Sequence, residues 1–493
     1  MSAASPGETR SCDVAIVGAG PSGLAAAEVM RGHGLKVTII DEQLRAGGQI
    51  LRQPPRSFSV DHWLEARLYK AAKSVLHSME DRSDVEWLLG TTVLGITRRS
   101  AYRATMEKIA GHELWLQTPS GCEVLHASAV LIAPGCYERP LPFPGWTLPG
   151  VMGAGAIQGF VKSQQFVPGK GFVLAGSHPL QLVVADQLVA AGADVAAVVF
   201  TQQFQQAAAM LRHPLVMLRH TLQLAETARI LLRLRRARVP VKFGRTIARA
   251  EGTNGVERAV IAGLLPGGKI DWNRTESLDC DRVGVCHGFL ASSELARQAG
   301  ARVAWRENEG GWLADHDEWF ESSVPRVFVA GEITGVAGAD AALEKGRVAG
   351  AGILRALERV DTSTAQRLAR SARRRLRRIG RFAAMLHALA RPPQDLANET
   401  MSDEATLCRC ESISRGEFER QLQLNPHVVS ADAAKLLTRA GMGMCQGRLC
   451  GDNVTRTIAR QRGLTVAEVG AFQAQAPVKP IQLDVLCSRC SSA

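Results

Sequence analysis

The sequence predicts an α/β fold made of two strand–helix–strand units and a small helical domain that carries four cysteines. Three observations predict it: a glycine-rich turn between apolar strands in residues 12–42, a similar pattern in residues 169–200, and two cysteine pairs between residues 408 and 450. A chain of 493 residues, 46% of them hydrophobic, is long enough for two or three domains with cores of their own.

The first unit reads CDVAIVGAGPSGLAAAEVMRGHGLKVTIIDE and contains a turn of the form Gly-x-Gly-x-x-Gly. Gly18 permits the tight turn, Gly20 lets the backbone approach a pyrophosphate, and Gly23 lets the helix pack close to the strand. A glycine triplet alone would be a weak signal, but here strand, glycines, helix and second strand follow one another in order.

The helix after this turn begins at Pro21 and Ser22 and offers free N–H groups and the positive end of its dipole to phosphates. Asp41 ends the second strand, 23 positions after Gly18, and is placed to accept the hydroxyls of a ribose, with Glu42 as the second candidate. The motif predicts dinucleotide binding without separating FAD from NAD.

Two further stretches separate these cofactors. Residues 130–146 read VLIAPGCYERPLPFPGW, an apolar strand that ends at a turn containing Gly135. Residues 325–350 contain the apolar strand VFVA, which runs into Gly331 and Glu332 before a glycine-rich turn and a helix. An acid after such a strand suits hydrogen bonding to the ribityl and pyrophosphate groups of a flavin.

With these motifs the chain resembles the two-dinucleotide-binding-domain flavoproteins, the class of glutathione and thioredoxin reductases. The resemblance implies an FAD domain into which a second Rossmann-like domain is inserted. It also places the GGQI segment, with Gly48 and Gln49, near the flavin. Two departures stand out: Glu332 replaces the usual aspartate of the third motif, and Pro134 replaces a threonine in the Ala-Thr-Gly turn.

The second unit, GKGFVLAGSHPLQLVVADQLVAAGADVAAVVF, lacks several features that bind a nucleotide. His178 replaces the second glycine and would obstruct a pyrophosphate, and no acid follows the strand that ends at Phe200. We expect a retained scaffold that holds another nucleotide or none, with NAD(P)H the less favoured alternative. Residues 150–160 lack the redox-active Cys-x-x-Cys of thioredoxin reductases, and Cys136 stands alone, which disfavours disulfide reduction.

The remaining signal is the pair Cys408-x-Cys410 and the pair Cys445-x4-Cys450, each in a turn before a helix. Four thiolates in two pairs suit zinc or a [2Fe–2S] cluster, and the Cys-x-Cys spacing is less usual for structural zinc. Both kinds of site use thiolate ligands. Backbone N–H groups and helix N-termini would donate to the sulfur atoms.

The segment from about 401 to 470, with the wording TRAGMGMCQGRLCG, resembles the bacterioferritin-associated-ferredoxin-like [2Fe–2S] domain. Together with the flavin motifs, GGQILRQPPR at 47–56 and GFLASSELARQAG at 288–300, it makes the whole chain similar to one family. This family is the alpha-type subunits of hetero-oligomeric amino-acid and opine dehydrogenases, which include opine oxidases, hydrogen cyanide synthases and D-hydroxyproline dehydrogenases.

This second resemblance implies an electron-transfer subunit with FAD and a [2Fe–2S] cluster, inactive alone. A separate beta subunit, similar to D-amino-acid oxidase, would oxidise a CH–NH donor, often with a small ferredoxin-like subunit, and FMN can lie at the alpha–beta interface. Electrons would leave to a quinone or another chain acceptor. The sequence shows no catalytic constellation of acid, base and nucleophile, which suits such a role.

Two alternatives stay open. One is a stand-alone NAD(P)H-dependent FAD oxidoreductase of the ferredoxin-reductase type, which the altered turn at 176–180 disfavours. The other is a scaffold that has lost its flavin and only binds partners, which the intact first motif disfavours.

The formal net charge of +12 comes largely from one stretch, QRLARSARRRLRRIGRF at 366–382. Aromatic residues make up 5% of the chain and none interleaves with these arginines, which disfavours nucleic acid and favours a solvated or partner-facing helix. The polar start and the lack of a long apolar run predict a cytoplasmic protein without signal peptide or transmembrane segment. Peripheral membrane association stays open.

We expect five parts, with boundaries uncertain by ten residues or more. They are a discontinuous FAD domain at 1–165 and 266–356, an inserted domain at 166–265, an arginine-rich helical linker at 357–400, the [2Fe–2S] domain at 401–470, and a tail at 471–493. Cys487 and Cys490 in this tail are expected to be a mobile pair of thiols rather than metal ligands.

Overall fold

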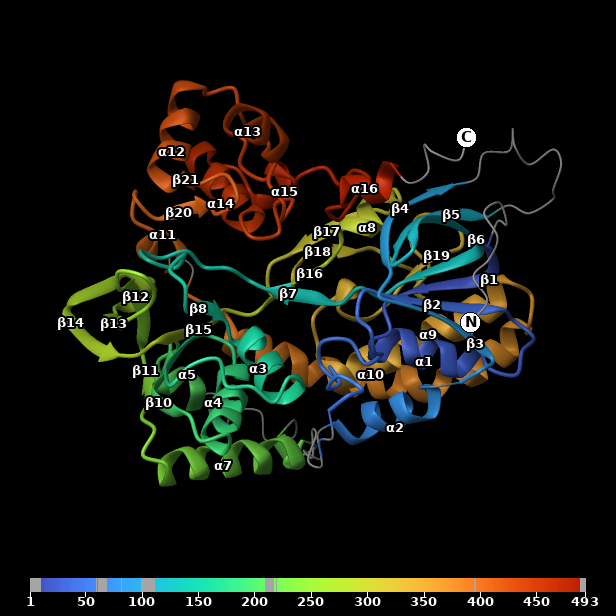
Figure 1. Ribbon diagram of the computed structural model, residues 1–493, viewed down its shortest axis with the longest axis horizontal. Coiled ribbons are helices and arrows are strands. Elements are labelled where there is room, and N and C mark those ends of the chain that lie inside the picture. The colour runs from blue at the N-terminus through green and yellow to red at the C-terminus, as the bar shows by residue number, and fades with distance from the viewer. Residues whose placement is uncertain are drawn as a thin grey trace.

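The structure is a computed structural model that describes residues 10–58, 60, 69–80, 82–98, 111–208, 217–218, 220–393 and 396–487. Figure 1 shows a sheet-based first domain that contains β1, a second α/β body around β9 and β10, and a small helical domain at the upper left that contains α14. The α/β class expected from the sequence is confirmed.

The first domain is built on a parallel sheet with the order β3-β2-β1-β6-β19. Its strands are β1 Arg10–Val17, β2 Val37–Asp41, β3 Val85–Leu89, β6 Gly121–Ile132 and β19 Val327–Val329. The first half of β6 also pairs antiparallel with β5 (His112–Thr118), which pairs with β4 (Thr92–Arg98). Because β19 returns to this sheet after the second body, two separate parts of the chain form the first domain.

Both faces of this sheet are covered, as a parallel sheet requires. Successive residues of β1 point to opposite faces: Val14 and Ile16 pack in one core, and Ala15 packs in the other. The covering helices include α1 Pro21–Met30, α2 Lys70–Met79 and α9 Ala339–Ala356 on one face, and α8 Glu294–Gln298 on the other.

The second body has a parallel sheet with the order β11-β10-β9-β15-β8 and an antiparallel meander, β12-β13-β14. Its strands are β8 Val151–Gly153, β9 Gly171–Gly176, β10 Asp194–Phe200, β11 Val241–Phe243, β12 Arg245–Glu251, β13 Arg258–Leu264, β14 Ile270–Asp279 and β15 Arg282–Cys286. Its helices include α3 Ala154–Ser163, α4 Leu180–Ala190, α5 Phe204–Ala208 and α7 Thr221–Arg236. The strands of this body span residues 151–286, a wider range than the expected 166–265. The short strands β8 and β15 belong to this sheet because β15 pairs with β9 and β8 pairs with β15.

Short paired strands connect the bodies. They are β7 Cys136–Glu138 with β16 Phe289–Ala291, and β17 Val303–Arg306 with β18 Gly311–Ala314. Both pairs are antiparallel and lie near the C-terminal domain in Figure 1.

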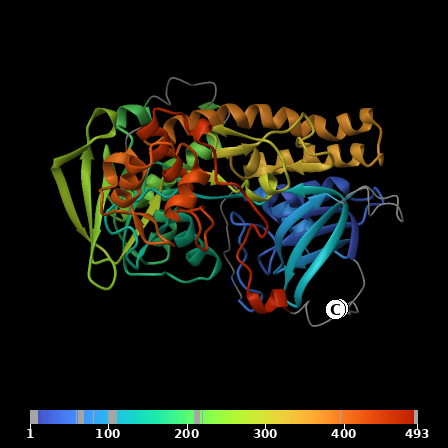
Figure 2. The same cartoon turned by 90° about the horizontal axis from the view of Figure 1, so that it is seen from above.

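The arginine-rich segment forms one long helix, α10 (Thr362–Ala390). Ala365 and Ala369 pack in the core of the first domain, and Figure 2 shows α9 and α10 running side by side along one edge. Farther along α10, the ring of Phe382 stacks on His220 of the second body, with the ring centroids 4.1 Å apart. The helix therefore joins two bodies, and only its outer face is left to solvent.

The C-terminal domain has a core of its own, which includes Phe418, Leu422, Val454 and Ile458. Its elements are β20 Thr406–Cys408, β21 Ile413–Ser414, α12 Arg415–Leu424, α13 Ala431–Thr438, α14 Gly451–Arg462 and α15 Val466–Val469, with α11 Leu396–Thr400 leading into it. The chain then returns to the first domain and ends its described part in α16, Leu483–Cys487.

Two further expectations concern the C-terminal cysteines and membrane-spanning helices. Cys490 and the side chain of Cys487 lie outside the described residues, so their role stays a prediction. Among the described helices, none combines the length and the apolar character that crossing a bilayer requires.

Candidate functional site

The motifs of the first domain meet at one edge of its sheet. Gly18 follows β1, Asp41 ends β2, Gly135 comes shortly after β6, and Gly331 comes shortly after β19. Since these strands are parallel, their carboxyl ends lie together, and this edge is where open α/β sheets bind ligands. The fold thus brings together four segments that are far apart in sequence.

Glycine is required here by close backbone contact. A Cβ on Gly18, whose φ is +109°, would collide with the carbonyl oxygen of Ala133, and a Cβ on Gly23 would collide with that of Gly18. A third contact was not anticipated from the sequence: a Cβ on Gly346 of α9 would collide with the carbonyl oxygen of Ser22 in α1. Helices α1 and α9 therefore cross at backbone contact.

The start of α1 forms a cradle suited to a pyrophosphate. Gly20 precedes the helix with no side-chain cap, so N–H groups of the first turn keep no side-chain acceptor. The Ser22 hydroxyl is buried and has no hydrogen-bond partner among the described residues. Gly48, with φ +61°, faces Gly20 so closely that a Cβ on Gly48 would come within 2.9 Å of the Gly20 Cα. This cradle fits the phosphates of a dinucleotide.

Asp41 is anchored to two turns, the glycine-rich turn after β1 and the turn after its own strand, β2. Its Oδ2 accepts a hydrogen bond from the N–H of Ala19 at 2.7 Å, and its Oδ1 accepts one from Gln43 at 2.8 Å. Burial raises the pKa of Asp41, although these N–H groups oppose the shift. Glu42 points elsewhere and forms an ion pair with Lys479 of the C-terminal tail at 2.8 Å. Ribose binding by Asp41 stays a prediction.

Glu332 is held by the turn that precedes α9, and its contact with a flavin stays a prediction. Its carboxylate accepts hydrogen bonds from the N–H groups of Ala337 at 2.8 Å and Gly338 at 3.0 Å, in the turn before α9. The nearby Lys345 ammonium donates to the carbonyls of Gly331 at 3.2 Å and Gly335 at 2.7 Å. Burial raises the pKa of Glu332 and lowers that of Lys345 to about 8. This pair shapes the loop that faces α1.

The GGQI segment is fixed by two further contacts. Gln49 donates from Nε2 to the carbonyl of Cys136 at 3.0 Å, which ties the segment to β7. Lys162 of α3 donates from Nζ to the carbonyl oxygens of Gln49 at 2.9 Å and Ile50 at 3.0 Å. Burial, with the charge of Arg52, lowers the pKa of Lys162 to about 7. The sequence analysis did not single out Lys162, which is the one charged residue in the stretch AIQGFVKS.

Glu138 is a second buried titratable group that the sequence analysis missed. It ends β7, and its carboxylate reaches the start of α3, where it accepts a hydrogen bond from the N–H of Gly155 at 2.9 Å. A Cβ on Gly153 would collide with the Glu138 carboxylate, so the glycines of GVMGAGA leave room for it. Burial raises the pKa of Glu138 to about 7. It adjoins the segment 150–160, where the sequence lacks the Cys-x-x-Cys of thioredoxin reductases.

The second body places His178 in the turn between β9 and α4. Its ring is partly buried, accepts a hydrogen bond at Nδ1 from the N–H of Leu180 at 3.2 Å, and meets Phe289 edge-on with the ring centroids 5.0 Å apart. Burial lowers the pKa of His178 to about 4. Gln202, just after β10, donates to the carbonyl of Ser177 at 2.9 Å. This bridge spans the strand ends where a dinucleotide would lie.

A cavity of about 490 Å³ opens beside His178, toward α10 and α14. His287 lines it and is fully buried, and neither of its ring nitrogens has a partner among the described residues. The cavity therefore remains at the edge of this sheet although the nucleotide motif is altered.

The four cysteines lie together in the C-terminal domain. The thiol of Cys450 contacts those of Cys408 and Cys445, and Cys445 contacts Cys410. The Cys450 contact, together with backbone N–H groups such as that of Gly441 to Cys408, lowers the pKa of Cys408 to about 6 and of Cys445 to about 5. Among the described residues, no group of three or more His, Cys, Asp or Glu side chains is arranged to hold a single metal ion.

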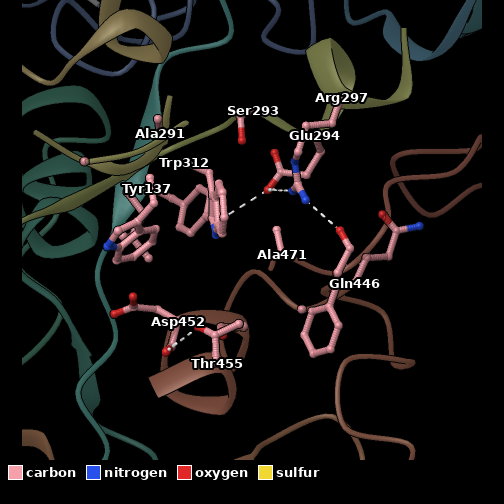
Figure 3. A pocket seen from close by; sticks show the side chains of 16 residues that line it. Tyr137, Ala291, Ser293, Glu294, Arg297, Trp312, Gln446, Asp452, Thr455 and Ala471 are labelled. Atoms are coloured by element: carbon pink, nitrogen blue, oxygen red, sulfur yellow. Dashed lines mark hydrogen bonds and ion pairs between the residues drawn. The ribbon is translucent and has the colours of Figure 1, made fainter. Parts of the chain in front are cut away.

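The loop between α13 and α14 carries Cys445 and Cys450 and is called the cysteine loop here. It is docked against the first domain at α8. Arg448 donates to the carbonyl of Cys445 at 3.3 Å and forms an ion pair with Glu294. Arg297 donates to the carbonyl of Phe472 at 2.6 Å. Figure 3 shows the small pocket at this contact, about 50 Å³, with Glu294 and Arg297 on one side and Gln446 on the other. The contact brings the loop that carries Cys445 and Cys450 close to β7, because Tyr137 of β7 lines the same pocket as Gln446 and Gly447.

The geometry agrees with comparisons to known proteins. Residues 12–351 match the family described as pyridine nucleotide-disulphide oxidoreductase. The chain belongs to this family. This family implies FAD, so the chain is an FAD-dependent oxidoreductase. The resemblance to two-domain flavoproteins inferred from the sequence is thereby confirmed.

Relatives in the same family are parts of larger enzymes. The chain is 32% identical over 483 residues to the A-subunit of opine oxidase from Agrobacterium tumefaciens (strain Ach5), and the match covers 96% of this chain and 90% of that protein. It is 30% identical over 469 residues to the HcnB subunit of hydrogen cyanide synthase from Pseudomonas aeruginosa, with 94% and 96% covered. L-Proline dehydrogenase from P. horikoshii shares the fold, with a TM-score of 0.70, 18% identity, and 97% of this chain and 80% of that chain covered.

Proposed function

We propose that this chain is the electron-transfer subunit of a multi-subunit amino-acid or opine dehydrogenase in the cytoplasm. A partner subunit similar to D-amino-acid oxidase would oxidise a CH–NH donor, and the chain would be inactive alone. A small ferredoxin-like subunit, and FMN at the interface with the partner, belong to the same proposal. Electrons would leave through a [2Fe–2S] cluster on the four cysteines Cys408, Cys410, Cys445 and Cys450.

The observation that carries the proposal is the docking of the cysteine loop on the flavoprotein domain. Arg448, next to the loop carbonyl of Cys445, pairs with Glu294 of α8, so the two candidate cofactor sites belong to one packed unit. When bound, a flavin accepts electrons in pairs and an iron–sulfur cluster carries them singly, which is the chemistry a relay needs. The residues of this chain supply placement and electrostatics.

The donor set supports a thiolate-ligated cluster. Four thiols joined by successive contacts from Cys408 to Cys450, Cys445 and Cys410, with N–H groups near the sulfur atoms, match how proteins hold and tune such clusters. On the flavin side, the α1 cradle would hold the pyrophosphate, and Asp41 would face the ribose. Lys162 and Glu138 would fix the segments next to the flavin, through their bonds to Gln49 and Gly155.

The test is metal and flavin analysis of protein purified without oxygen, followed by electron paramagnetic resonance of the reduced sample. We expect one FAD, iron and sulfide in equal amounts, and a rhombic signal from a reduced cluster. Cys410→Ser and Cys445→Ser should lose that signal, whereas Cys122→Ser, a change in β6 of the first domain, should keep it. Zinc without iron or sulfide would contradict the cluster.

A second arm tests the assembly. Co-expression with the product of a neighbouring gene similar to D-amino-acid oxidase should yield a stable complex. That complex should reduce an artificial dye when given the right amino acid or opine, and this chain alone should not. Dye reduction by the isolated chain with an amino acid would contradict the proposed division of labour.

A further inference from the structure

The outer face of α10 carries an unusual run of positive charge. Six exposed arginines lie along it: Arg367, Arg370, Arg374, Arg377, Arg378 and Arg381. At 3.6 residues per turn they fall within about 100° of arc and extend over about 21 Å. This arc lies opposite Ala365, Ala369 and Ala372, which pack in the core of the first domain.

The neighbouring arginines of α10 are used differently. Arg373 forms an ion pair with Glu318 at 3.4 Å, and Arg375 forms one with Glu344 at 3.0 Å. For the six arginines of the outer face, no ion pair with a carboxylate is found in the described part of the chain. The two arginines at the sides of the helix therefore form ion pairs with carboxylates, whereas the positive charge of the outer stripe has no such carboxylate partner in the described part of the chain.

Helix α7 continues this surface with a mixture of leucine and arginine. Leu222, Leu231 and Leu232 are 64%, 40% and 48% exposed, although α7 buries only Ile230 and Leu234. The last turn carries Arg235 and Arg236, both exposed. Large apolar side chains at the surface, flanked by arginine, are typical of a helix that lies at a lipid headgroup layer.

The two helices are neighbours. His220 directly precedes α7, and its ring stacks on Phe382 of α10 with an interplanar angle of 11°. Burial lowers the pKa of His220, and the charge of Arg378, one of the six arginines, lowers it as well. Leu222, two residues after His220, therefore lies close to the arginine stripe of α10. Leu232 lies about 80° from Leu222 around α7 and continues this side of the helix, whereas Leu231 lies about 180° from Leu222 on the opposite side.

We infer that this surface, formed by α7 and the outer face of α10, binds an anionic phospholipid membrane. The arginines complement lipid phosphates, and the leucines can enter the boundary of the acyl layer. Nucleic acid fits less well, because single-stranded binding relies on aromatic side chains and the exposed large residues of α7 are leucines. The inference does not depend on which cofactors the chain holds.

The experiment is sedimentation of the full-length, flavin-loaded chain with vesicles. Vesicles of phosphatidylcholine alone are compared with vesicles of phosphatidylcholine and phosphatidylglycerol in equal parts. We expect binding only to the second kind, falling as salt is raised, because salt screens exposed charges. Failure to bind anionic vesicles, or equal binding to both kinds, would overturn the inference.

Arginine substitutions test whether the outer face of α10 is the part of the chain that binds vesicles. The triple change Arg370→Gln, Arg374→Gln and Arg377→Gln should lower vesicle partitioning on the order of a hundredfold, since each arginine near an anionic surface contributes about fivefold. The matched control is Arg274→Gln, Arg306→Gln and Arg420→Gln, which removes the same charge from exposed arginines of β14, β17 and α12. The control should bind like the parent. Equal losses in both triples would overturn the inference.

The apolar half of the surface is tested separately. Leu222→Ser with Leu232→Ser should weaken partitioning at least several-fold while flavin content and circular dichroism stay unchanged. Unchanged partitioning would reject the role of α7. If the parent ignores vesicles but its arginine stripe is needed to co-sediment an acidic partner protein, the surface is a protein interface and the membrane inference is wrong.

Discussion

Glu294 of α8 and Arg448 of the cysteine loop face each other across the contact between the first domain and the C-terminal domain, with 3.8 Å between Oε2 and Nη2. Both side chains are largely buried, 10% and 15% exposed. Glu294 also lies 4.0 Å from Arg297 and accepts a hydrogen bond from the Tyr137 hydroxyl at 3.4 Å. One carboxylate thus ties together β7, α8 and the loop that carries Cys445.

Replacing Glu294 with glutamine should loosen this docking. The change leaves two nearly buried guanidinium groups without their carboxylate, which costs about 3 kcal/mol. We expect a lower unfolding midpoint and faster hydrogen exchange in residues 441–451. The control is Glu318→Gln, whose carboxylate is 70% exposed and pairs with Arg373, so its effect should stay below about 0.5 kcal/mol. Equal effects of the two changes would argue against a docking role for Glu294.

The crossing of α1 and α9 should tolerate no added methyl group. Gly346→Ala would drive a Cβ into the carbonyl oxygen of Ser22, and overpacking of this kind costs about 1–3 kcal/mol. Because Ser22 belongs to the cradle, flavin content should fall too. Gly380→Ala is the matched control: Gly380 lies within α10 with nothing near its Cβ, and alanine should stabilise the chain by about 1 kcal/mol. Denaturant unfolding and flavin absorbance measure both.

Glu138 should make stability depend on pH. Burial raises its pKa from 4.5 to about 7, so the folded state binds more protons than the unfolded state between these values. Its contribution is therefore fully present below about pH 4.5 and is lost as pH rises to about 7, a change of about 3 kcal/mol. Glu138→Gln keeps an oxygen for Gly155 and removes the titration. Urea unfolding between pH 5 and pH 8 should show a shallower decline in the variant, and parallel curves would contradict this assignment.

Reduced nicotinamide dinucleotides should not reduce the flavin of the isolated chain rapidly. His178 occupies the position of the second glycine, and the Gln202 side chain bridges to Ser177 across the strand ends. Stopped-flow absorbance with NADH and with NADPH should show slow or no bleaching of the flavin band, while dithionite bleaches it fully. Rapid reduction by either nucleotide would favour a stand-alone NAD(P)H oxidoreductase instead.

The sequence was most informative where local backbone chemistry decides the structure. The glycines at 18, 20 and 23, the strand ending at Asp41, and the cysteine spacing could be recognised because each motif lies within one turn or one strand–helix–strand unit. The helix in the arginine-rich segment could be predicted for the same reason. Gly331 and Glu332 follow β19, as the sequence predicted, and within the chain Glu332 accepts hydrogen bonds from N–H groups of the following turn.

Only the tertiary structure decided contacts between segments distant in sequence. Folding brought Lys162 to the GGQI segment and Glu138 to the start of α3. Pairing with β9 drew the short strand β15 into the second sheet, and pairing with β15 added β8. Packing also set which arginines of α10 form ion pairs and which remain in solvent. The physical reason is that motifs depend on neighbours along the chain, whereas desolvation and ion pairing depend on neighbours in space, which the order of residues does not reveal.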